Sequence, residues 1–289
     1  MRNSRPKAIP EGSDKRSQSY AQRHELVLSS GLSLVHDPFV HRGKTVGMDK
    51  GLFIFIRGRL CAGESAGLGL PVWKTGGITF FPSSKFMEAA GENTIHKVFT
   101  FDRTIAWTIS GMKAPAGFGW IMERLVEGYM KKTAWQKLFL KVRNRAFSTL
   151  RIKSGMVPCK KGKGSCEVTY EAVPEGMLVH VVSFLPGGQG RLIMLNEVDG
   201  ESFSVLRMGN RLYKGQEIPA WAEASFDAVI ESPKLRIGVS LAPDKGEDPS
   251  GYTVFCGREL GFGLDWAGIS LVNGSRSFTY QVRIKQLPD

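Results

Sequence analysis

An unbroken series of strand-like runs extends from Cys166–Ala172 (CEVTYEA) to the C-terminus, and this half of the chain decides the fold. Short runs rich in Val, Ile, Phe and Thr recur at intervals of roughly 10 to 15 residues, with Gly, Pro, Asn or Asp between them. The further runs are Leu178–Phe184, Arg191–Asn196, Ser202–Arg207, Phe226–Ile230, Leu235–Leu241, Tyr252–Gly257, Gly268–Val272 and Ser277–Ile284. So many short strands, with no helices alternating between them, predict an antiparallel β-sandwich or supersandwich. Between the last two, Asn273–Gly274 predicts a hairpin whose central residues both need positive φ.

The N-terminal half adds strands, a tail and a helical insert. Strand-like runs occur at Leu52–Arg59 (LFIFIRGR), Gly77–Phe81, His96–Phe101 and Ile105–Ile109. Residues 1–25 are polar and predict a disordered basic tail. From about 117 to 150 apolar residues recur at helical spacing, which predicts two consecutive basic amphipathic helices. The expected organisation is therefore a tail over 1–25 and one β-sandwich domain over 26–289 that carries the helical insert.

Positive charge is concentrated in the insert and the tail. The net charge is +12, and the stretch from Lys113 to Lys163 has thirteen Lys or Arg against Glu123 and Glu127. A basic insert on a nearly neutral body indicates a local electrostatic surface. Its polyanion-binding candidates are Lys131, Lys132, Lys137, Lys141, Arg143 and Arg145.

Three readings of this basic surface remain open. An acidic glycan or an anionic membrane would suit it, since basic amphipathic helices with aromatic residues lie on bilayer interfaces. A helix packed on the sheet with a solvated basic face is the third reading. Nucleic acid is an unlikely partner because the chain has no RNP-like strand, helix-turn-helix spacing or KH loop.

Two glycine-rich segments supply ligand-binding candidates. Gly63–Pro71 precedes Trp73 and Lys74, and Glu64 lies within it. No helix and no G-K-[ST] follow, so a nucleotide site is disfavoured, and a bulged loop between two strands is the alternative reading. The second segment holds Arg258, Glu259, Asp265 and Trp266, a set that could bind a sugar by stacking and by carboxylate chemistry. Its alternative reading is an Arg–Glu pair beside a core Trp.

Glu197 and Glu259 are the catalytic candidates. Glu197 ends an apolar run, so its carboxylate is either a hydrogen-bonded structural group or an acid with a raised pKa. If the protein is an enzyme, we expect carboxylate acid–base chemistry on a sugar, of lyase, epimerase or hydrolase type.

No metal or cofactor is predicted. The four cysteines match no zinc spacing, and His36 with His41 is a weak metal signal. Cys159 and Cys166 could form a disulfide across a hairpin, but without a signal peptide we expect reduced thiols. No apolar run is long enough to span a bilayer, and the N-terminus has no apolar signal core. The expected location is cytoplasmic, with peripheral membrane association as an option.

The order of features resembles the β-supersandwich of heparinase II/III-like polysaccharide lyases. The resemblance rests on Phe81–Phe86 (FPSSKF), Asp102–Arg103, Leu195–Glu197 (LNE) and Gly257–Glu259 (GRE), with a helical interlude between the second and third. It implies a supersandwich fold and sugar ligands. It assigns no catalytic residue, because those enzymes carry their catalytic Tyr and His on an α-toroid for which this chain has no room.

The leading hypothesis is binding, extended to processing, of a carbohydrate-like or acidic ligand in a cleft on the sandwich. One alternative is a peripheral membrane or lipid-handling protein that uses the basic helices. A second alternative is a non-catalytic structural module. The oligomeric state is left open.

Overall fold

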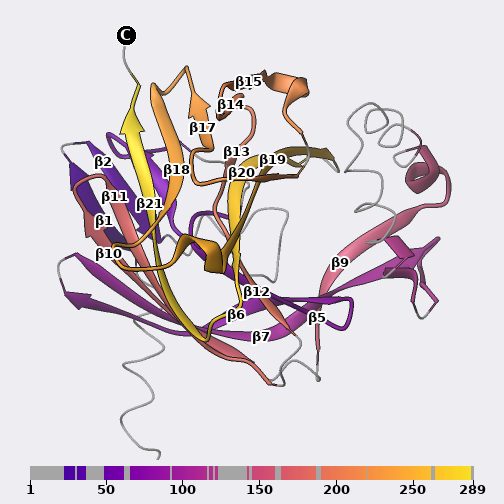
Figure 1. Cartoon of the computed structure of the whole chain (residues 1–289). Coiled ribbons are helices and arrows are strands. Elements are labelled where there is room, and N and C mark those ends of the chain that lie inside the picture. Colours follow the sequence, from indigo (N-terminus) through magenta and orange to yellow (C-terminus); the bar gives the residue numbers. More distant parts are fainter. Residues whose placement is uncertain are drawn as a thin grey trace, which may run out of the picture.

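The computed structural model describes most of the chain from residue 23 onward (Figure 1). The described residues are 23–29, 31–36, 49–61, 66–91, 93–115, 117–119, 121–122, 142, 145–159, 164–186, 190–219, 221–261 and 264–287, without the side chains of 84–90 and 259–265. The predicted tail over 1–25 therefore lies almost wholly outside the described residues.

The first layer of the fold is a long antiparallel sheet. In spatial order its strands are β6 (Ile78–Gly91), β7 (Thr94–Ile109), β10 (Ser165–Val173), β11 (Gly176–Phe184), β21 (Ser277–Gln286), β18 (Ile237–Pro243), β17 (Val229–Ser232), β14 (Val205–Met208) and β15 (Arg211–Lys214). The C-terminal half of β7 extends beyond its pairing with β10. There it pairs with β8 (Met112–Lys113) and β9 (Ile152–Pro158).

The second layer is shorter and is joined to the first at one corner. It consists of β5 (Leu70–Thr75), β12 (Arg191–Leu195), β20 (Leu264–Asn273), β19 (Tyr252–Gly261) and β16 (Ala222–Ala224), with β13 (Glu197–Asp199) pairing to β20 beyond the end of β12. The corner is made by β5, which pairs with β6 of the first layer as well. Among the described residues, 3₁₀ turns cover Gly215–Glu217 and Pro249–Gly251.

A separate four-stranded sheet precedes both layers. Its strands are β1 (His24–Ser29), β2 (Leu32–His36), β3 (Phe53–Ile56) and β4 (Arg59–Leu60), paired in that order. The side chains of β3 and β2 are mostly buried and join the main hydrophobic core. This sheet therefore belongs to the same core as the two larger layers.

Alternating burial places the core between the layers. Along β10, Cys166, Val168 and Tyr170 are buried while their neighbours are half-exposed, as expected for a strand with one face on a core. The facing strand β20 contributes Ala267 and Ile269 to the same cluster. The paired strands are antiparallel throughout, and the predicted antiparallel β-sandwich is confirmed.

Three sequence expectations change in detail. The Asn273–Gly274 hairpin prediction is wrong, because β20 and β21 pair with different partners and Gly274 is not at positive φ. Asn273 Oδ1 instead accepts from Ser275 N at 2.7 Å, so an Asx turn carries the chain from one layer to the other. The runs His96–Phe101 and Ile105–Ile109 form one strand, β7, and β5 was not predicted.

Helical residues are described at both ends of the predicted insert, at Phe118, Gly119, Ile121 and Met122 and again at Val142 and 145–149. They pack beside the outer part of the sheet, where Met122, Phe147 and Ile152 form a small second hydrophobic cluster. The middle of the insert lies outside the described residues.

Candidate functional site

The first predicted ligand segment is mostly backbone structure. Glu64 lies outside the described residues, and β5 begins at Leu70. Trp73 is only 3% exposed and stacks on Phe80, with ring centroids 4.9 Å apart. Since β5 lies between β6 and β12, a side chain on its inner face has little access to a ligand. Lys74, the next residue, is half-buried.

Glu197 and the preceding Asn196 hold the chain just before β5. Glu197 is buried, and its Oε2 accepts a hydrogen bond from Ala66 N at 3.0 Å. Asn196 Oδ1 accepts from Gly69 N at 2.9 Å. Gly69 has φ +74°, and a Cβ there would stand 2.5 Å from the ring of Tyr170, so only glycine fits. These contacts give the Glu197 carboxylate a structural task.

The second predicted segment is brought together by strand register. Trp266 on β20 stands opposite Asp199 of β13 on one side and opposite Glu259 of β19 on the other. The Trp266 ring packs against Trp221, with centroids 4.8 Å apart, and both rings are half-exposed. Trp221 was not among the predicted residues. This pair is an aromatic surface of the kind on which sugar rings stack.

Arg258 stands one register position further along, opposite Ala267, and its backbone N donates to Pro219 O at 2.9 Å. The side chains of Glu259 and Asp265 lie outside the described residues, so their catalytic and binding roles stay predictions. Of the polyanion candidates, the described Arg145 is exposed, while Lys131, Lys132, Lys137, Lys141 and Arg143 lie outside the described residues.

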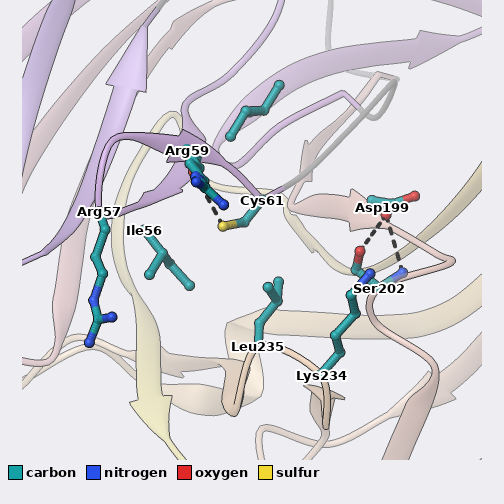
Figure 2. A pocket seen from close by; sticks show the side chains of 9 residues that line it. Ile56, Arg57, Arg59, Cys61, Asp199, Ser202, Lys234 and Leu235 are labelled. Carbon is teal, nitrogen blue, oxygen red and sulfur yellow. Dashed lines mark hydrogen bonds between the residues drawn. The ribbon is translucent and has the colours of Figure 1, made fainter.

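A pocket of about 730 Å³ lies between the small N-terminal sheet and the two larger layers. Figure 2 shows Ile56 and Arg57 on one side, and Asp199, Ser202 and Lys234 on the other. Arg57 lies in the β3–β4 turn and Arg59 begins β4, whereas Asp199 ends β13 and Lys234 lies in the β17–β18 turn. The lining is completed by Leu60, Cys61 and Leu235.

The pocket carries excess positive charge. Arg57, Arg59 and Lys234 are exposed, and none of them has a carboxylate within 4 Å among the described residues. The single carboxylate in the lining, Asp199, is already used: its Oδ2 accepts from Ser202 N at 3.1 Å and from Ser202 Oγ at 2.7 Å, and its Oδ1 accepts from Glu201 N at 3.3 Å. Cys61 donates to Arg59 O, and burial raises the pKa of its thiol.

Sequence reasoning missed this pocket because its cations looked like parts of strands and turns. Arg57-Gly-Arg59 closes the predicted strand Leu52–Arg59, and the structure shows a tight turn there, with Arg57 at φ +48°. Two arginines that flank a glycine at the end of an apolar run were the one available signal. Lys234, far away in sequence, carried none.

A second cluster of charged groups is fully buried under the N-terminal sheet. Lys97 on β7 is 0% exposed, and its Nζ lies 3.2 Å from Asp49 Oδ2 and donates to Lys50 O at 2.8 Å. His36 Nδ1 of β2 is 3.4 Å from the same Nζ, and the Phe99 ring lies beneath it. Burial lowers the pKa of Lys97, and the charge of Asp49 partly opposes this effect. The cluster joins the small sheet to the first layer.

Other sequence predictions have these structural counterparts. All four cysteines are free thiols in the structure, Cys159 half-buried and Cys166 buried. Within the described ranges, no group of three or more His, Cys, Asp or Glu is placed to hold a metal ion. His41, the residue paired with His36 in the weak metal signal, lies outside the described residues. No helix in the described part of the chain is long and apolar enough to cross a membrane.

No family model and no curated protein matches the sequence. Among solved structures, the chain is similar to a candidate aldose 1-epimerase of Escherichia coli K12 (7% identity, TM-score 0.42, covering 92% of this chain and 100% of that one). It is similar to a galactose mutarotase-like protein of Lactobacillus casei (8% identity, TM-score 0.40, 91% and 100%). It is also similar to the 4-alpha-glucanotransferase of Thermococcus litoralis (10% identity, TM-score 0.33, 94% and 40%).

Proposed function

We propose that the protein binds an anionic carbohydrate in the pocket formed by Arg57, Arg59, Asp199 and Lys234. The observation that carries this proposal is a pocket of about 730 Å³ whose three cations have no carboxylate partner among the described residues. This volume lies within the range of small-molecule sites.

The ligand's negative charge follows from the pocket's own imbalance. Three cations against one carboxylate leave a net positive site, and the Asp199 oxygens already accept hydrogen bonds from Ser202 and from Glu201 N. A carboxylate, sulfate or phosphate group would accept charge-assisted hydrogen bonds from the guanidinium groups of Arg57 and Arg59. Because these cations are exposed in the structure, they can bind the ligand without first leaving a charge buried in the interior.

The carbohydrate part of the proposal rests on the paired rings of Trp221 and Trp266. Trp266 stands directly opposite Asp199 in the sheet, and opposite residues of an antiparallel pair project from the same face. The aromatic surface is therefore one strand away from the pocket wall. A sugar ring lying on it would leave an acidic substituent within reach of the pocket.

The lining favours binding over chemistry. Asp199 is engaged by Ser202, and the Cys61 thiol has a raised pKa, so it stays protonated and is a weak nucleophile at neutral pH. Acid–base processing of the bound sugar by Glu197 and Glu259 stays a prediction from the sequence.

Calorimetric titration with a uronic-acid disaccharide, and with its neutral counterpart, tests the proposal. We expect binding of the acidic sugar only, weakening as salt is raised. Arg59→Gln and Lys234→Gln should each weaken it by roughly tenfold, the worth of one hydrogen bond to a charged group. Lys153→Gln is the matched control, since Lys153 is exposed on β9, away from the pocket. Equal affinity for both sugars, or equal losses in all three variants, would rule the assignment out.

A further inference from the structure

A basic lobe projects from the side of the sandwich where the C-terminal half of β7 meets β8 and β9 (Figure 1). We define it by its described residues, 104–115, 117–119, 121–122, 142 and 145–157. They include Lys113, Arg145, Arg151 and Lys153, and no Asp or Glu. Among these described residues no carboxylate neutralises the positive charge, and such a surface attracts anions.

Exposed apolar side chains gather on the same lobe. Met112 is 72% exposed and Leu150 is 50% exposed. Half of the exposed large hydrophobic side chains of the described chain are found on this small part of it: Ile105, Met112, Ile121, Val142, Leu150 and Val157. Apolar side chains scattered singly need no explanation, but a concentration of them indicates an interaction site.

Strand pairing sorts these two kinds of side chain at the tip of the lobe. Thr108 of β7 has Lys113 of β8 on one side and Lys153 of β9 on the other, so both lysines belong to one face. The next residue, Ile109, stands between Met112 and Ile152, which belong to the opposite face.

Leu150 is held at the same tip. Ser110, which follows Ile109 at the end of β7, donates from its backbone N and from its Oγ to Leu150 O, each at 3.1 Å. Ser110 and Gly111 both have positive φ, which closes the tight turn into β8. The tip thus presents exposed Met112 on one face and a pair of lysines on the opposite face, with exposed Leu150 bonded to the turn that joins β7 to β8.

We propose that this tip inserts into the surface of an anionic lipid bilayer, with Met112 and Leu150 entering the interface and Lys113 and Lys153 meeting the head groups. Lipid fits better than a soluble polyanion, because a polyanion would use the lysines but would leave the apolar side chains in water. The surface is separate from the anionic pocket and does not depend on the proposed function.

Co-sedimentation with vesicles tests this proposal. The full chain should bind phosphatidylcholine vesicles that contain about 30% phosphatidylserine, should bind pure phosphatidylcholine far less, and should be released by high salt. The double variant Lys113→Gln, Lys153→Gln should weaken binding by roughly fivefold for each lysine. Met112→Ser should weaken it by up to tenfold, since the apolar side chain no longer enters the interface.

Matched controls separate a specific surface from general stickiness. Phe184→Ser removes a side chain that is 54% exposed on β11, and Lys285→Gln removes an exposed charge on β21; neither should change vesicle binding. The tip residues are exposed, so all variants should keep the wild-type melting temperature. Absence of vesicle binding, equal losses in the controls, or retention on heparin without vesicle binding would each overturn the proposal.

Discussion

Tyr280 Oη donates a hydrogen bond to Asn196 Oδ1 at 3.3 Å, and this bond joins the two layers of the sandwich through the middle of its core. The same Asn196 oxygen accepts from Gly69 N, and Tyr170 Oη donates to Gly69 O at 2.8 Å. Both tyrosines are 0% exposed. Two first-layer strands are therefore tied to the chain segments that begin β5 and β13.

Because Tyr280 is buried, we expect the free energy of unfolding to decrease at alkaline pH. Burial raises the pKa of Tyr280 above its ordinary value of 10.0, so the unfolded chain loses this proton first. The stabilisation is complete below pH 10 and is lost as pH rises through the unfolded pKa toward the folded one. One unit above the ordinary pKa, a single such group costs about 1.4 kcal/mol. Urea unfolding from about pH 8 to about pH 11 should show a shallower decline for Tyr280→Phe than for wild type.

Tyr213→Phe is the control for that experiment, because Tyr213 is half-buried on β15, outside the core cluster proper. At pH 8 the Tyr280→Phe variant should lose about 1 kcal/mol, the worth of one buried hydrogen bond. If the wild-type and Tyr280→Phe curves run parallel across the whole range, Tyr280 is not the group that titrates.

Removal of the buried lysine should be severe. Lys97→Met leaves Asp49, whose side chain is 1% exposed, without its cation at 3.2 Å. Breaking a buried ion pair from one side costs about 3–5 kcal/mol, because a charge remains in the interior. Chemical denaturation at neutral pH measures this loss of unfolding free energy.

The double variant Lys97→Met, Asp49→Leu identifies the cause. With both charges replaced by apolar groups of similar size, most of the loss should be recovered. A double variant that is no more stable than Lys97→Met would show that packing and the bond to Lys50 O dominate, and that the ion pair contributes little.

The sequence was sufficient to predict the fold class because the spacing of short strand-like runs and turn residues can be recognised locally. Runs such as Cys166–Ala172 carry their own β-propensity and turn boundaries, and the structure has β10 at nearly those limits. Which strands pair is a property of the whole chain. Asn273–Gly274 has the composition of a hairpin turn, yet β21 pairs with β11 and β18, and the Asn273 side chain makes a different turn.

The candidate site was less predictable for the same reason. Trp73 lies in a short apolar run whose sequence does not show whether the strand pairs on one side or on both. In the structure β5 pairs with β6 and with β12, and Trp73 is buried. The pocket brings Arg59 together with Asp199 and Lys234, which lie more than a hundred residues further along the chain. Trp266 was predicted from the residue types close to it in sequence. Its partner Trp221 was not predicted, because only the fold brings the two rings together.

Variants of Glu197 should separate a hydrogen-bonding role from a charge role. Glu197→Gln keeps a side-chain oxygen that can accept from Ala66 N, so we expect a small loss of stability. Glu197→Ala leaves that buried N–H without its acceptor and should cost about 1–3 kcal/mol. Melting temperatures of the two variants decide between the roles, and equal losses would show that the charge, rather than the hydrogen bond, is what matters.

Gly268 lies opposite Glu197 in the sheet, and its lack of a side chain lets β20 approach the backbone of the β12–β13 segment. A Cβ at this position would stand 2.5 Å from Asn196 O and 3.0 Å from Glu197 Cα, so the Gly268→Ala variant must push backbone away. The displaced carbonyl is the acceptor for Ile269 N at 3.0 Å, and moving it weakens that bond as well. We expect a loss of about 1–3 kcal/mol, as for other overpacked cores.

Gly155→Ala on β9 is the matched control for Gly268→Ala, since an added Cβ there meets nothing within 4 Å. It should leave stability unchanged or raise it by about 0.5 kcal/mol through a less flexible unfolded chain.

Because Trp266 lies two residues from Gly268 and stands opposite Asp199, the Gly268→Ala shift should also move the pocket wall and weaken binding of the acidic disaccharide. Thermal melts and calorimetric titration measure both effects. Equal melting temperatures for the two alanine variants would show that the second layer yields at this contact, and unchanged affinity in a destabilised Gly268→Ala variant would separate the pocket from the β13–β20 pairing.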